Sequence, residues 1–254
     1  MHTSNLAIMI FVGLIVFGIP LTGPFERRIY RSDPATSLKF LAYGINLVVL
    51  WTLTAVAVRI DGLERLFARP AAGEAWLWAP SISSLALGLA AGAYVIVGFL
   101  PLIQSLRGMR WRLAYEAAIR RNFLDIPGLL PNTPTERAAW IALSFTAGIC
   151  EEGLYRGFLI RFLHEGGVDM PLFAALVASS LIFGLAHVYQ GARGVLATTI
   201  GGFALGLAFL LSGSLTLSIV LHVFMDLQLA YIVRPTLKPR GGDGLEAQAL
   251  RSNR

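Results

Sequence analysis

Apolar residues along this chain gather into long runs that are separated by short polar segments. A helix that crosses a bilayer needs about 20 consecutive, mostly apolar residues. The runs therefore predict an all-α fold, a polytopic membrane helical bundle of about seven transmembrane helices, with six to eight compatible with the pattern. The predicted spans are residues 5–22, 38–58, 80–103, 138–163, 170–189, 194–212 and 214–233.

Composition supports this prediction. Of 254 residues, 56% are hydrophobic and 14% are charged, and the mean hydropathy is +0.66, which is typical of an integral membrane protein. Three regions are expected: membrane helices with an amphipathic connector over 1–137, a helical core over 138–233, and a disordered cytoplasmic tail over 234–254, which is short of apolar residues.

The basic residues indicate topology. The net charge is +6, but the arginines lie in short segments between apolar runs instead of forming a nucleic-acid-binding patch. The first loop carries Arg27, Arg28 and Arg31, and the third loop carries Arg107, Arg110, Arg112, Arg120 and Arg121. The positive-inside rule places both loops in the cytoplasm, so seven crossings put the N-terminus outside and the C-terminus in the cytoplasm.

Two local patterns concern the connector and the helix that follows it. Residues 109–124 mix apolar and charged side chains, which fits either an amphipathic helix on the membrane surface or a soluble loop helix. Thr133-Pro134-Thr135-Glu136 is a capping box with proline at the first helical position, so it predicts the start of the fourth helix.

Glu151 and Glu152 lie at the midpoint of the apolar run 138–163. A charge at the centre of a lone spanning helix costs about 2.5–3.5 kcal/mol, so both carboxylates need compensation. Glu152 and Arg156 are four residues apart and share a helix face, which predicts a pair between them. Glu151 points about 100° away around the helix and needs a partner from another helix.

Two later runs offer such partners. His187 shares a face with Phe183, and His222 shares a face with Asp226, each pair being one helical turn apart. These groups converge only if the fourth, fifth and seventh helices pack together. Purely structural alternatives remain open: a buried Glu152–Arg156 ion pair, histidines that hydrogen-bond between helices, or mutual satisfaction of His222 and Asp226.

The constellation suits hydrolysis. A carboxylate in an apolar cavity can serve as a general base, so a water molecule between Glu151 and His187 could lose its proton to them and attack a carbonyl. A ring N–H of His222 could then donate to the tetrahedral oxyanion. Asp226 would have to be protonated to donate, or else orient His222. Cys150 is the only cysteine, so neither an intramolecular disulfide nor a cysteine-based zinc site can form.

The motifs Glu151-Glu152-Xaa-Xaa-Xaa-Arg156, Phe183-Xaa-Xaa-Xaa-His187 and His222-Xaa-Xaa-Xaa-Asp226 resemble those of the CPBP family of membrane proteases, also called the ABI family. This family includes the type II CAAX prenyl endopeptidases. The resemblance covers about residues 138–233. It implies an intramembrane endopeptidase that uses neither a metal nor a cofactor.

The resemblance also implies the role of each site residue. Glu151 and His187 would activate water, while His222 and position 226 would support the oxyanion. Glu152 and Arg156 would hold the site in shape. Prenyl endopeptidases of this type usually carry Asn where this chain has Asp226.

The expected substrate is a peptide or protein at the membrane, with or without an attached lipid, and nucleic acid is not expected. Alternatives are a non-catalytic scaffold or bacteriocin-immunity-type protein of the same family, and a zinc-dependent membrane protease, although no His-Glu-Xaa-Xaa-His motif is present. A proton-coupled transporter is a further alternative, without a visible inverted repeat. Arginine outnumbers lysine 19 to 2, which together with the compact loops suggests a bacterial cytoplasmic membrane.

One geometric conflict arises from the predicted spans. His187 lies near the cytoplasmic end of its run, whereas Glu151 lies roughly 20 Å along a straight helix from residue 138, at about 1.5 Å per residue. A tilt, a kink, or a fourth helix that begins outside the bilayer is needed to bring them together. A water-filled cavity that faces the cytoplasm is predicted.

Overall fold

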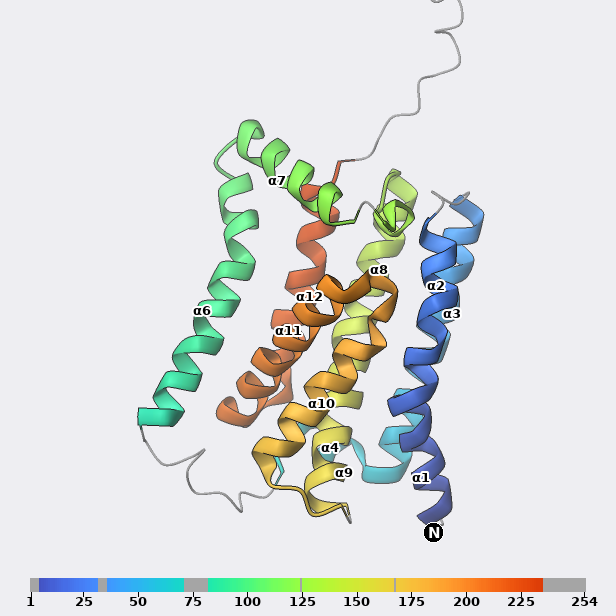
Figure 1. Cartoon of the computed structure of the whole chain (residues 1–254), viewed down its shortest axis with the longest axis vertical. Helices are drawn as coiled ribbons and strands as arrows, with labels where there is room; N and C mark the ends of the chain where they lie inside the picture. The colour runs from blue at the N-terminus through green and yellow to red at the C-terminus, as the bar shows by residue number, and fades with distance from the viewer. Residues whose placement is uncertain (1–4, 32–35, 71–81, 124, 167, 235–254) are drawn as a thin grey trace, which may run out of the picture.

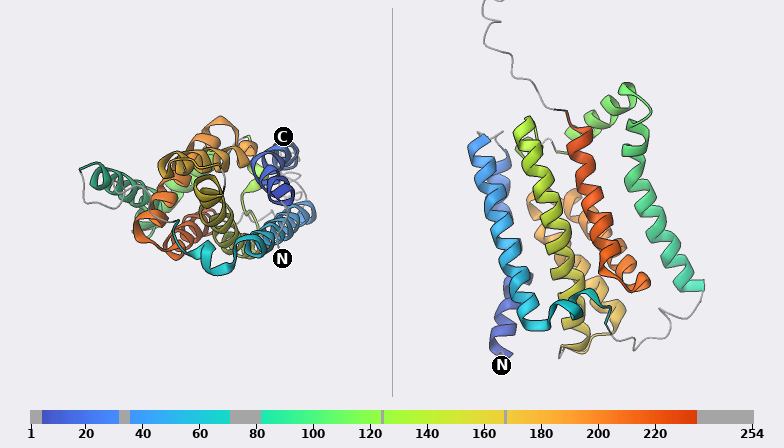
Figure 2. Two further views of the ribbon diagram at one scale, coloured as in Figure 1. Left: turned by 90° about the horizontal axis from the view of Figure 1, so that it is seen from below. Right: turned by 180° about the vertical axis from the view of Figure 1, so that it is seen from behind.

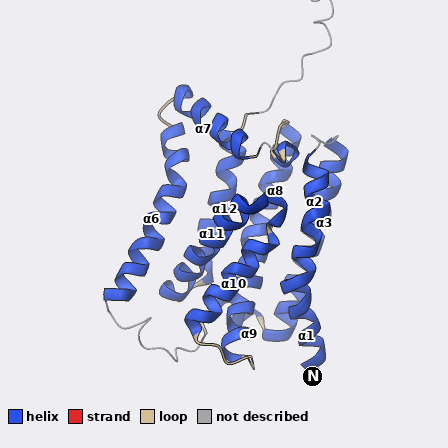
Figure 3. Cartoon of the chain, in the orientation of Figure 1, coloured by secondary structure: helices blue, strands red, loops and turns tan. Residues whose placement is uncertain are grey.

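The computed structural model describes residues 5–31, 36–70, 82–123, 125–166 and 168–234. Regular structure in these residues is helical throughout (Figure 3), apart from an isolated bridge between Ala68 and Ser214. The all-α prediction is therefore confirmed. The predicted disordered tail, from residue 235 onward, lies outside the described residues.

The helices follow one another along the chain in two groups (Figure 1). The first group comprises α1 (Asn5–Gly13), the π-helical turn η1 (Leu14–Gly18), α2 (Ile19–Arg31), α3 (Thr36–Asp61), α4 (Leu63–Phe67), α6 (Ile82–Ser105), α7 (Met109–Asn122) and the 3-10 turn η2 (Pro127–Leu129). The second group comprises α8 (Pro134–Glu151), the π-helix η3 (Glu152–Leu159), α9 (Ile160–Glu165), α10 (Leu172–Ala186), the 3-10 turn η4 (Val188–Gln190), α11 (Gly191–Ser212) and α12 (Leu215–Ile232).

Four described helical segments are long and apolar enough to cross a bilayer: Leu6–Arg31, Leu38–Asp61, Val188–Ser212 and Leu215–Ile232. Two further apolar helical stretches are Gly92–Ser105, which is part of α6, and α10 (Leu172–Ala186). The predicted run 138–163 lies within the continuous α8–η3–α9 segment, which carries several charges. The count of seven spans and the orientation of the termini thus stay predictions.

The bundle is organised around α8, which packs against α12 on one side and α3 on the other (Figure 2). The α10–α11 pair packs against η3 and α12, and α6 lies at the edge of the bundle against α11. Helix α7 crosses one end of the bundle (Figure 1). The turn between α10 and α11 lies well short of that end in both figures.

Helix α8 begins where the capping box predicts. The Thr133 Oγ1 accepts a hydrogen bond from the Glu136 backbone N–H at 3.1 Å, and Pro134 occupies the first helical position. The Glu136 carboxylate accepts from the Asn132 backbone N–H at 2.8 Å and from the Lys39 ammonium at 3.0 Å. Because both charged side chains are buried, this ion pair fixes α3 against the start of α8.

Close approach between α8 and α12 depends on Gly148. A Cβ atom at this position would lie 3.2 Å from the Val223 backbone nitrogen and 3.3 Å from the Ile219 carbonyl oxygen. The missing side chain lets the two backbones approach, as small residues do at helix interfaces in membranes. Consequently, the end of α8 lies directly beside the middle of α12.

Candidate active site

The two central carboxylates lie where the α-helical hydrogen-bond pattern changes. Glu151 is the last residue of α8, and Glu152 is the first of the π-helix η3. All eight residues of η3 are buried. π-Helical turns are rare and are frequent at functional sites. The change from α-helical to π-helical hydrogen bonding therefore falls on the two adjacent carboxylates that stand out in the sequence.

Glu152 is completely buried and is shared by two partners. Its Oε1 atom lies 3.1 Å from an Arg156 guanidinium nitrogen, the pair that the spacing predicts. The same oxygen lies 2.8 Å from the Nδ1 atom of His222 in α12. The sequence did not indicate this second bond, because 70 residues separate the two side chains. It joins the first and third motifs directly.

The bond to Glu152 determines what the other His222 nitrogen can do. A carboxylate accepts, so the Nδ1 atom carries the proton and donates. The Nε2 atom then faces Glu151 and Asp226, and it lies 3.8 Å from a carboxylate oxygen of each. Neutral His222 therefore presents a lone pair at Nε2, and only the imidazolium presents an N–H there. Glu151 finds its partner on another helix, as its position required.

The aromatic ring of Phe183 packs against the basic side chains of the site. The Arg156 guanidinium lies 4.3 Å from the centre of the Phe183 ring, within the range of a cation–π contact. The centres of the His187 and His222 rings lie 4.7 and 6.1 Å from that of Phe183. Gly202 of α11 leaves room for this packing, since a Cβ atom there would lie 2.8 Å from the Phe183 ring and 3.0 Å from Arg156.

His187 terminates α10, and its Nδ1 atom lies 2.9 Å from the Phe183 carbonyl oxygen. Because a carbonyl only accepts, Nδ1 donates and Nε2 is left with a lone pair. Among the described residues, no direct hydrogen bond or ion pair joins His187 to Glu151. The two side chains are brought to the same region of the bundle without touching.

The relative extent of the helices bears on the predicted depth conflict between Glu151 and His187. Helix α8 extends beyond the α10–α11 turn toward the end of the bundle that α7 crosses (Figure 1). The end of α10 therefore lies beside the length of α8 and not at the end where α8 begins. The site is also partly open, since the side chains of Glu151 and Asp226 are 15% and 33% exposed.

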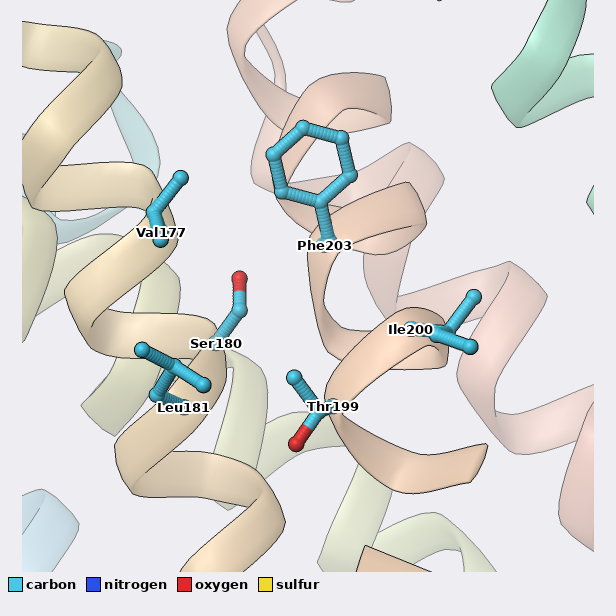
Figure 4. A pocket seen from close by; sticks show the side chains of 6 residues that line it. All are labelled: Val177, Ser180, Leu181, Thr199, Ile200 and Phe203. Carbon is cyan, nitrogen blue, oxygen red and sulfur yellow. The ribbon is translucent and has the colours of Figure 1, made fainter. Parts of the chain in front are cut away.

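Two further observations bear on ligands. Within the described part of the chain, no group of three or more His, Cys, Asp or Glu side chains is arranged to hold a metal ion. A cavity of about 200 Å³ lies between α10 and α11, with side chains from both helices pointing toward it (Figure 4). Its lining contains no carboxylate or imidazole, and it comprises Val177, Ser180, Leu181, Thr199, Ile200 and Phe203. We assign no chemistry to it.

Together, the fold and the cluster define a helical membrane protein with carboxylate, imidazole and guanidinium groups gathered inside the bundle. A family model described as type II CAAX prenyl endopeptidase Rce1-like matches residues 133–228. The resemblance predicted from the three motifs is confirmed, and the matched segment contains all six candidate site residues. Comparisons with curated proteins and with solved structures gave no match.

Proposed function

We propose that the protein is a membrane-embedded endopeptidase that hydrolyses a peptide bond with water activated by Glu151 and His187, without a metal. The observation that carries this proposal is the convergence of the three motifs: Glu152 bonds His222 at 2.8 Å, and His222 lies 3.8 Å from Glu151. A membrane protease function of the CAAX type agrees with the family of residues 133–228.

In the proposed mechanism, a water molecule bridges Glu151 and His187, which form no direct hydrogen bond or ion pair among the described residues. The proton of that water passes to the carboxylate or to the lone pair on His187 Nε2, while its oxygen attacks the carbonyl carbon. The C–N bond of the resulting tetrahedral intermediate then breaks, and the proton moves to the leaving nitrogen. The products are a carboxylic acid and an amine, so the step needs no other reactant.

His222 and Asp226 support the oxyanion in this proposal. The Nε2 atom of His222 donates a hydrogen bond only when the ring is protonated, and three carboxylates around the ring favour that form: Glu151, Glu152 and Asp226. Asp226 thus acts through His222 and needs no proton of its own. Glu152 and Arg156 fix the orientation of the ring.

The proposed substrates are peptides of membrane-associated proteins, including peptides with a C-terminal CAAX sequence. Asp226 stands where prenyl endopeptidases usually carry Asn, so a prenyl group is treated as a variable of the assay. Farnesylated and unmodified versions of one fluorogenic peptide separate a requirement for the lipid from recognition of the peptide alone.

The decisive experiment compares purified full-length protein with Glu151→Gln in liposomes. Removing a general base reduces the rate by about 10²–10⁴-fold, so the variant should lose nearly all cleavage while it still binds the peptide. Glu64→Gln is the matched control because Glu64 is exposed in the short helix α4, outside the candidate site. Equal cleavage by Glu151→Gln and the unmodified protein would contradict the proposal and favour the scaffold alternative.

A chelator separates the metal-free mechanism from the zinc alternative. Cleavage should persist after prolonged incubation with a strong chelator and subsequent desalting. If activity disappears and zinc restores it, the metal-free mechanism is wrong even though the protein is a protease.

A further inference from the structure

Helix α2 brings residues from outside the matched segment to the candidate site. It packs against the turn η4 that follows His187 (Figure 1). A Cβ atom on Gly23 would overlap the side chain of Val188, and the ring centres of Tyr30 and Tyr189 are 6.2 Å apart. Residues 23, 26 and 30 are spaced by three and four, so they share one helix face. Glu26 therefore lies on the face of α2 that covers this turn.

Glu26 is partly buried there, and one of its carboxylate oxygens is held. Oε1 accepts a hydrogen bond from the Thr22 hydroxyl at 2.9 Å. Among the described residues, no lysine or arginine forms an ion pair with Glu26; the neighbouring Arg27 instead pairs with Asp125 at 3.4 Å. The carboxylate interacts electrostatically with both His187 and Glu151. A partly buried carboxylate without an ion-pair partner among the described residues thus lies on the face of α2 that packs against the turn beside His187.

His187 has few other charged neighbours. The titratable groups that interact with its ring are Glu26 from α2, and His222 and Asp226 from α12. The rings of Phe183 and Tyr189 pack against the imidazole, with centres 4.7 and 5.8 Å away. Since Nδ1 is held by the Phe183 carbonyl oxygen, a proton that His187 gains goes to Nε2. The ring then becomes a cation with Glu26 as the carboxylate on its α2 side.

We propose that Glu26 is a positioning residue that stabilises the protonated form of His187, an inference that rests on the proposed peptidase function. When His187 takes the proton of the attacking water, the imidazolium gains a favourable interaction with the Glu26 carboxylate. When the proton moves to the leaving nitrogen, that interaction is lost again. The N-terminal helices thereby contribute to the chemistry of a site whose motifs all lie in residues 133–228.

The test uses Glu26→Gln, which keeps the shape and removes the charge, and Glu26→Asp, which restores the charge. In full-length protein in liposomes, we expect Glu26→Gln to lower kcat about tenfold or more with KM within about twofold, because only the transition-state interaction is lost. Glu26→Asp should recover most of kcat. Equal losses in both variants, or a change confined to KM, would overturn the proposal.

A second measurement, the titration of His187 by NMR, does not depend on peptide cleavage. The chain has four histidines, so isotope-labelled histidine gives a simple NMR spectrum in which His187→Gln identifies the His187 signal. In Glu26→Gln, the midpoint of the His187 titration should fall, because an opposite charge near the ring favours its protonated form. An unchanged midpoint would overturn the inference. The His164 signal serves as the control for intact folding, because its Nδ1 lies 2.8 Å from the Met170 carbonyl oxygen, away from the site.

The two readouts distinguish the inference from the proposed function. If the unmodified protein cleaves no peptide while the His187 midpoint shifts in Glu26→Gln, the electrostatic contact is real and the peptidase function is wrong. If cleavage is robust and the midpoint does not move, the peptidase function stands and the role of Glu26 is wrong.

Discussion

Buried charged residues link the stability of this molecule to the geometry of its candidate site, and Glu152 is the clearest example. Its side chain has no exposed surface, and one oxygen serves both Arg156 and His222. Isolated charges in such surroundings are strongly disfavoured, so each of the three groups requires the others. The residue thus maintains the fold and the orientation of a candidate site histidine at the same time.

Removal of the Glu152 charge should therefore affect both properties. Glu152→Gln leaves the Arg156 guanidinium uncompensated at 2% exposure, and breaking a buried pair in this way costs about 3–5 kcal/mol. We expect a clearly lower thermal unfolding temperature in detergent together with loss of peptide cleavage. Glu64→Gln, in which an exposed carboxylate is replaced, should unfold like the unmodified protein. An unchanged unfolding temperature for Glu152→Gln would show that the pair contributes little.

The sequence predicted some of these residue contacts and not others. Spacing along one helix was enough for Glu152 and Arg156, because residues four apart must face each other. The bond between Glu152 and His222 depends on how far α8 slides along α12, which backbone contacts at Gly148 determine. The approach of Glu26 to His187 depends likewise on the packing of α2 against η4. No local pattern encodes either relation.

Among the helices, the interface between α8 and α12 sets the dimensions of the candidate site. Glu151 follows Gly148 by three residues, and His222 immediately precedes Val223, which packs at the Gly148 position. If α8 and α12 move apart at Gly148, the distance between the Glu151 carboxylate and the His222 Nε2 atom, which is 3.8 Å, must also change. The interface therefore acts as a spacer for the site.

Gly148→Ala tests this spacer. The added Cβ would lie 3.2 Å from the Val223 backbone nitrogen, so the two helices must move apart. A displacement of about 1 Å can cost about 10²-fold in rate, so a shift of a few tenths of an ångström should cost roughly tenfold or less. We expect a loss in that range with unchanged helix content by circular dichroism. Gly44→Ala is the control, because nothing lies within 4 Å of a Cβ atom at Gly44. Full activity of Gly148→Ala would mean that the spacing is not critical.

Helix α7 acts on α12 at the end of the bundle. Arg120 of α7 donates to the Arg234 carbonyl oxygen at 3.1 Å, and Arg137 of α8 donates to that of Val233 at 2.7 Å. These cations satisfy carbonyls just beyond the end of α12 and suit its helix dipole. Glu116 of α7 completes the contact, with Oε2 lying 2.9 Å from Arg234. The amphipathic pattern predicted the helix but not this role.

This contact should depend on pH. Burial opposes ionisation of Glu116, but hydrogen bonds from Arg234 and Arg120 outweigh it and hold the Glu116 pKa below its ordinary value of 4.5. Ionised Glu116 therefore stabilises the fold above pH 4.5, and the contribution is lost as the pH falls through the folded-state pKa. Unfolding temperatures of the unmodified protein and Glu116→Gln should differ at pH 7 and converge toward pH 3. A constant difference would contradict this assignment.

In the whole molecule, the polar groups of the candidate site lie inside an apolar bundle. The basic loops predict that the α7 end faces the cytoplasm, and Asp226 is 33% exposed within the bundle. The general architecture followed from the apolar runs. The extent of the α10–α11 pair did not, because hydropathy measures how apolar a segment is and not where its turn lies relative to neighbouring helices.

Labelling of single cysteines tests the predicted orientation. In a Cys150→Ala background, Asp226→Cys should react with a membrane-impermeant maleimide in inside-out vesicles and remain unlabelled in right-side-out vesicles. Glu64→Cys, located near the opposite end of the bundle, should show the reverse pattern. Labelling of Asp226→Cys only in right-side-out vesicles would mean that the site opens to the other side.

The early turn after α10 also has a consequence for the surrounding lipid. With 15 residues, α10 is roughly 22 Å long at about 1.5 Å per residue, whereas the hydrocarbon layer of a typical bilayer is about 30 Å thick. The mismatch is relieved if the leaflet beside α10 thins or admits water. The protein would then perturb the membrane next to its own candidate site, and lipids with shorter acyl chains would suit it best.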